Sequence, residues 1–123
     1  MAAPNLIGAT TINGKTSGLV LANTSPLLVL NNAASSGKLL RINTVTFANR
    51  SANAATGSLV YYAAASLGGT PLEITANISI PGLSSFTAID KQTQYYLEEN
   101  SSLGAVAALA NTLVVTVSYE DVS

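Results

Sequence analysis

The chain has 123 residues, of which 48% are hydrophobic and only 9% are charged, with a formal net charge of -1. This length suits one domain, and the apolar content is large enough to offset the chain entropy lost on folding. Because the sequence contains neither His nor Cys, the commonest general base, the usual zinc ligands, thiol nucleophiles and disulfides are all excluded.

The N-terminal part of the chain contains a turn signal between β-prone residues. Asn13 and Gly14 both tolerate the positive φ angles of a type I′ turn, so they predict a β-hairpin whose second strand continues to Leu21. On this basis the chain divides into an N-terminal segment, residues 1–13, which is an arm or the first hairpin strand, and a β-sandwich domain, residues 14–123.

A long strand follows in which the apolar phase changes. Leu40 and Ile42 share one face, whereas strict alternation puts Val45 and Phe47 on the other. A β-bulge at 43–44 would return all four side chains to the core, because one extra residue flips the side-chain phase. A strand buried on both faces is the alternative.

The remaining apolar runs predict short strands that are separated by turn residues. After the N-terminal hairpin, strands are expected over residues 27–30, 38–48, 59–62, 72–80, 86–89, 95–97, 103–109 and 113–119. The last two strands are expected to pair with each other through a turn at 110–112. In residues 72–80 apolar and polar residues alternate, so one face of that strand is expected to face solvent. No segment shows a sustained helical period with caps. The predicted fold class is all-β: a single-domain antiparallel β-sandwich or jelly roll of about eight short strands.

The few acidic residues do not form a recognisable catalytic or metal site. Glu98 and Glu99 are adjacent, so on a strand they point to opposite faces and make a poor acid–base pair. Asp90, Glu120 and Asp121 offer oxygen ligands for calcium but lack the spacing of a calcium loop, and acids near a chain end favour a solvated position. We therefore expect a protein that is not an enzyme, with no cofactor and no metal.

Charge and hydropathy also bear on partners. The five cations are scattered along the chain: Lys15, Lys38, Arg41, Arg50 and Lys91. Binding to phosphates needs clustered positive charge, so no nucleic-acid partner is expected. The most apolar stretch, 103–117, is interrupted by polar residues and falls short of the roughly twenty needed to span a bilayer, so no membrane partner is expected either.

Interface residues are predicted from low charge and from the tyrosines. A surface with so few charges resists self-association poorly, which favours an assembled state. In the pairs Tyr61-Tyr62 and Tyr95-Tyr96 one ring should face outward, where it suits a protein interface, and the uncharged N-terminal segment can add a strand to a neighbouring subunit. The predicted partner-contacting residues are Pro4, Asn5, Leu6, Ile7, Tyr62 and Tyr96.

Four stretches of the chain carry a resemblance to known proteins: Ile12-Asn13-Gly14-Lys15-Thr16, residues 31–43, Tyr96-Leu97-Glu98-Glu99, and Val117-Ser118-Tyr119-Glu120-Asp121. In these the sequence resembles small virion structural proteins of tailed bacteriophages, particularly those infecting marine bacteria and cyanobacteria. The resemblance covers most of the chain. It departs at 51–54, where such proteins commonly carry Asp-Gly, and at 100–101, where Gly-Asp is common.

The resemblance implies a β-sandwich that decorates or cements a phage capsid. The partners would be the major capsid protein or other virion proteins, and the chain would form a homo-oligomer, with a trimer favoured. Its location would be the virion, assembled in the host cytoplasm. A neck or tail component is the alternative within the virion. A carbohydrate-binding module of an adhesion device is a further alternative, and it requires Tyr62 or Tyr96 exposed in a shallow groove.

Overall fold

The computed structural model describes residues 11–90, 92 and 94–123. Nine strands and no α-helix are found among these residues. The strands are β1 (Ile12–Val20), β2 (Leu27–Asn32), β3 (Leu39–Asn49), β4 (Ala55–Ala64), β5 (Gly68–Ile80), β6 (Ser85–Ile89), β7 (Tyr95–Leu97), β8 (Ser101–Ala107) and β9 (Leu113–Val122). No helix in the part of the chain that is described is long and apolar enough to cross a membrane.

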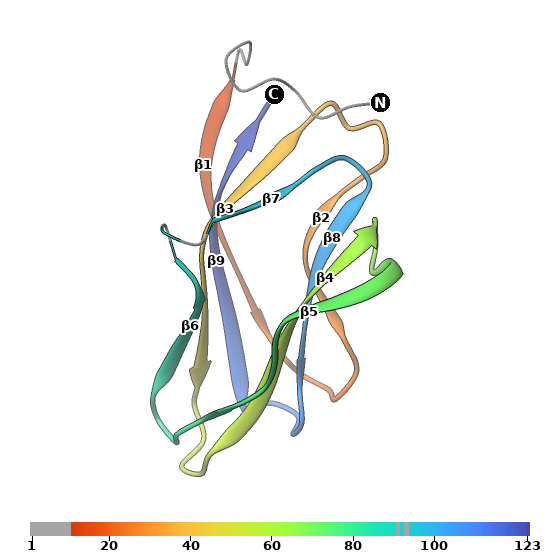
Figure 1. Cartoon of the computed structure of the whole chain (residues 1–123). Helices are drawn as coiled ribbons and strands as arrows, with labels where there is room; N and C mark the ends of the chain where they lie inside the picture. The colour runs from red at the N-terminus through yellow and green to blue at the C-terminus, as the bar shows by residue number, and fades with distance from the viewer. Residues whose placement is uncertain (1–10, 91, 93) are drawn as a thin grey trace.

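The strands form two antiparallel sheets that pack face to face (Figure 1). Sheet A has the order β1-β9-β3-β6, and β7 also pairs with β3. Sheet B has the order β2-β8-β4-β5. The predicted all-β, single-domain sandwich is therefore confirmed.

The core lies between the sheets and is built from alternate residues of the central strands. Leu59 and Leu103 of sheet B and Phe47 and Val115 of sheet A are at most 1% exposed. Such burial of apolar side chains contributes about 25 cal/mol per Å² to folding. The core is therefore the main source of stability in a chain without disulfides.

The predicted bulge in β3 is confirmed. Ile42 pairs with Tyr119 and Thr44 with Ser118, so the register shifts by one residue at Asn43. The four apolar side chains before and after the bulge are at most 5% exposed. One extra residue thus allows both halves of the strand to face the same core.

The predicted hairpin at Asn13 and Gly14 is wrong. Both residues lie inside β1, where they pair with Asp121 and Glu120 of β9, and neither has a positive φ. The backbone amide of Thr11 also donates to the carbonyl of Ser123 at 3.0 Å, and the amide of Ser123 donates to the carbonyl of Thr11 at 2.9 Å. The long ladder with β9 satisfies many more backbone groups than a local turn would. Residues 11–13 consequently belong to the sandwich.

The predicted pairing of the last two strands is also wrong, although a turn does connect them. β8 lies between β2 and β4 in sheet B, whereas β9 lies between β1 and β3 in sheet A. Each strand is hydrogen-bonded on both sides by other partners, so the connection passes from one sheet to the other. The Asn111 amide donates to the carbonyl of Leu21 at 2.8 Å and holds this crossing in place.

Candidate functional site

An exposed apolar patch lies at one edge of the sandwich, beside the short strand β7 of sheet A and the edge strand β5 of sheet B. We call it the edge patch. It surrounds a hollow of about 340 Å³ and consists of Tyr61, Leu72, Glu73, Ile74, Tyr95 and Tyr96. Within it Leu72 is 54% exposed, Tyr95 41% and Tyr96 46%. Exposed apolar side chains that are contiguous rather than scattered are typical of interaction sites.

The exposure of Leu72 departs from the alternation expected along β5. Ile80 at one end of the strand is fully buried, yet Leu72 lies on the surface. The register between β4 and β5 shifts repeatedly between these two residues, and each shift changes which face a side chain occupies. In addition β7 has only three residues, so sheet A offers this end of β5 little surface to pack against.

The two predicted outward tyrosines differ in exposure. Tyr96 is exposed and lies in the edge patch, whereas Tyr62 is only 7% exposed. Tyr62 packs with Leu67 over Gly104: a Cβ on that glycine would lie 2.7 Å from Leu67 Cδ2 and 3.0 Å from Tyr62 Cε1. The missing side chain at Gly104 leaves room for the Tyr62 ring. The expectation that Tyr62 contacts a partner is therefore corrected.

The other predicted interface residues, Pro4, Asn5, Leu6 and Ile7, lie outside the described residues. Of the six residues predicted to contact a partner, the structure thus places Tyr96 on the surface. Leu72, Ile74 and Tyr95 were missed. The signal that could have identified Tyr95 is its position in a very short strand, where neither face is well covered.

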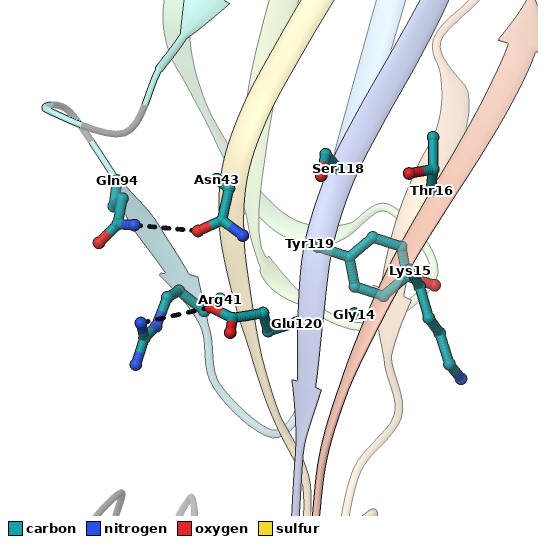
Figure 2. Close-up of a pocket in the computed structure, with 9 residues that line it drawn as sticks. All are labelled: Gly14, Lys15, Thr16, Arg41, Asn43, Gln94, Ser118, Tyr119 and Glu120. Atoms are coloured by element: carbon teal, nitrogen blue, oxygen red, sulfur yellow. Dashed lines mark hydrogen bonds and ion pairs between the residues drawn. The ribbon is translucent and has the colours of Figure 1, made fainter.

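A second hollow, of about 480 Å³, lies on sheet A (Figure 2). We call it the polar groove, and it is lined by Gly14, Lys15, Thr16, Arg41, Asn43, Gln94, Ser118, Tyr119 and Glu120. Arg41 Nη1 lies 3.3 Å from Glu120 Oε1, and Gln94 Nε2 donates to Asn43 Oδ1 at 2.9 Å. The Arg41 guanidinium also lies 6.0 Å from the centre of the Tyr96 ring.

A third hollow, of about 380 Å³, is lined mainly by residues of β2 and the loop after it, together with Asp121 of β9. This side chain is only 10% exposed and forms ion pairs with Lys15 at 3.2 Å and with Lys38 at 3.4 Å. The expected solvated position of Asp121 is therefore wrong, because β9 continues to Val122 and carries the carboxylate between the strands. Among the described residues no group of three or more acidic side chains is arranged to hold a metal.

Comparisons with known proteins give a likeness in structure but none in sequence. No protein-family model matches the chain, and no curated protein is detectably similar in sequence. A solved structure from Bacillus endospore appendages, described as a novel family of disulfide-linked pili, has a TM-score of 0.54 and 10% sequence identity. The match covers 98% of this chain and 94% of that chain. At this identity the likeness bears on the fold alone, and it agrees with the two-sheet architecture.

Proposed function

We propose that the chain is a non-catalytic structural subunit of a bacteriophage virion, most simply a capsid decoration or cement protein. The observation that carries this proposal is the edge patch, in which three large apolar side chains are exposed together on a chain with only 9% charged residues. Such a surface is disfavoured in water as a free monomer and gains stability when a partner covers it. The sequence resemblance described above supports the virion as the setting.

In this proposal the subunits first associate with one another. The edge patch adjoins the outer strands β5 and β7, each of which has one edge without a strand partner among the described residues and can also pair with a neighbour there. A closed ring, with a trimer favoured, covers the edge patch of every subunit and leaves no strand edge open for further association. The ring would then bury further surface against the major capsid protein or other virion proteins, which stabilises the shell without turnover or cofactor.

The oligomeric state of the purified protein tests the first step. Native mass spectrometry at micromolar concentration is expected to give a trimer or a higher ring, and the substitution Leu72→Asp is expected to shift it to monomer. Leu109 is similarly exposed, at 64%, but lies outside the edge patch, so Leu109→Asp is the matched control and should leave the oligomer intact. A wild-type protein that stays monomeric and does not bind purified capsids would refute the proposal.

A subunit of an extended fibre is a second candidate, since the solved structure that shares the fold comes from an endospore appendage. Both candidates need neighbours, but a fibre requires a contact that does not close on itself. Negative-stain microscopy of the concentrated protein separates them, since discrete rings favour the virion proposal and filaments favour the fibre. Within the virion, the position of this density in a cryo-EM map of the particle distinguishes capsid decoration from a neck or tail component.

A further inference from the structure

The strand register brings chemically varied side chains into one row on the outer face of sheet A. Gly14 pairs with Glu120, Glu120 with Arg41, and Arg41 with Tyr96, across β1, β9, β3 and β7. Partners in register lie on the same face of a sheet. This row therefore places four features side by side: the open space at Gly14, a carboxylate, a guanidinium and an aromatic ring.

The bulge in β3 adds a further polar group next to this row. Asn43 is the unpaired bulge residue, and bulges commonly redirect a side chain. Its amide oxygen accepts from Gln94 at 2.9 Å, so both amides are held at the groove (Figure 2). Each amide has a second polar atom, which gives the groove donors as well as acceptors close together.

The ion pair in the polar groove carries no net charge. Arg41 is paired with Glu120 at 3.3 Å, and the Lys15 ammonium is paired with the buried Asp121 at 3.2 Å. Figure 2 shows Lys15 pointing away from the Arg41–Glu120 pair. An anionic ligand would meet the Glu120 carboxylate, and an apolar peptide would meet polar groups that need hydrogen bonds. A neutral ligand rich in hydroxyl groups satisfies both conditions.

We propose that the polar groove binds a short neutral saccharide. A hydroxyl group both donates and accepts, so neighbouring hydroxyls of a sugar match the Arg41–Glu120 pair and the Asn43–Gln94 pair. Tyr96 is 46% exposed beside Arg41 and offers a ring on which the apolar face of a sugar can stack. The groove volume, about 480 Å³, lies within the usual range for a small-molecule site.

Gly14 provides a test that leaves the binding groups intact. A Cβ on Gly14 would meet no atom within 4 Å, and the residue lines the groove. Gly14→Val is therefore compatible with the strand and fills space that the sugar needs. Gly18 lies on the same strand and the same face, where a Cβ would make only ordinary contacts at 3.7 Å or more, but it is outside the groove. Gly18→Val is the matched control.

The experiment screens the full chain on an array of neutral and anionic glycans and measures the best neutral binder by calorimetry. We expect Gly14→Val and Tyr96→Ala each to weaken binding at least about tenfold, and Gly18→Val to leave it unchanged. Thermal melts of the variants show that the fold is intact. The proposal would be overturned if no glycan on the array bound, if only anionic glycans bound, or if the two valine substitutions had equal effects. The two proposals share Tyr96, which lies in the edge patch and beside Arg41 of the groove. Gly14→Val and Leu72→Asp separate them: the first should weaken sugar binding and leave the oligomer intact, and the second should break the oligomer and leave sugar binding intact.

Discussion

The side-chain amide of Asn49 donates to the carbonyl oxygen of Ile80 over 2.9 Å and so connects the end of β3 in sheet A to the end of β5 in sheet B. The same nitrogen donates to the carbonyl of Asn53 at 2.9 Å, and the amide oxygen accepts from the backbone and the hydroxyl of Ser51. Asn49 is only 2% exposed. One buried amide thus holds both sheets and the loop between β3 and β4.

Replacing Asn49 by Ala is expected to lower the free energy of unfolding by about 2–3 kcal/mol, because it leaves buried backbone groups without partners. Urea unfolding followed by circular dichroism measures the change. Asn53 is the control: its side chain is exposed and its carbonyl, which accepts from Asn49, is retained in Asn53→Ala. That variant should change stability by less than about 0.5 kcal/mol. Equal losses in the two variants would contradict the connecting role of Asn49.

The two lysines that pair with Asp121 are expected to substitute for one another. Each is about half exposed, at 48% and 49%, so the loss of one ion pair should cost less than about 1 kcal/mol. Removing both leaves a nearly buried carboxylate unpaired, so the double variant Lys15→Ala/Lys38→Ala should be less stable than the sum of the single variants predicts. Additive effects in a double-mutant cycle of unfolding free energies would argue against this.

The bulge in β3 predicts that the strand needs its one extra residue, Asn43. Deleting Asn43 would move Leu40 and Ile42 to the outer face of sheet A, because the side-chain phase would shift by one residue. The deletion variant is expected to lose cooperative thermal unfolding. Asn43→Ala keeps the extra residue and removes only the contact with Gln94, so it should retain a cooperative transition within about 1 kcal/mol of wild type. Cooperative unfolding of the deletion variant would show that the bulge is dispensable.

These examples show which parts of the structure could be predicted from the sequence. The bulge was predictable because it follows from the apolar phase of one short segment. The position of Asn13 inside strand β1 could not be predicted, because its pairing partner Asp121 lies at the other end of the chain. Asp121 itself was misplaced for the same reason, because its lysines are 106 and 83 residues away. Local patterns predict strands, and tertiary pairing decides which residues meet.

The candidate sites follow the same division. Tyr96 was predicted to face outward from its position in a strand, and it does. The polar groove could not be predicted, because its row of side chains is assembled by the register of four strands. Tyr62 was misjudged because the residue that makes room for it, Gly104, lies on the neighbouring strand β8.

Gly104 should therefore control whether Tyr62 is covered. A Cβ at this position would approach Leu67 Cδ2, Tyr62 Cε1 and the carbonyl oxygen of Leu27, at 2.7, 3.0 and 3.2 Å. The two side-chain atoms can move and the backbone oxygen cannot, so Gly104→Ala is expected to displace the ring outward. The cost should be about 1–3 kcal/mol, as for other overpacked sites.

Two measurements separate this displacement from general unfolding. Hydrogen exchange should show less protection at the backbone amides of Tyr62 and its neighbours in Gly104→Ala, while the amides of β3 and β9 remain protected. Gly14→Ala is the control, because a Cβ there meets nothing within 4 Å and the variant should be neutral or slightly more stable. If Gly104→Ala leaves stability and exchange unchanged, the space above Gly104 is not what keeps Tyr62 buried.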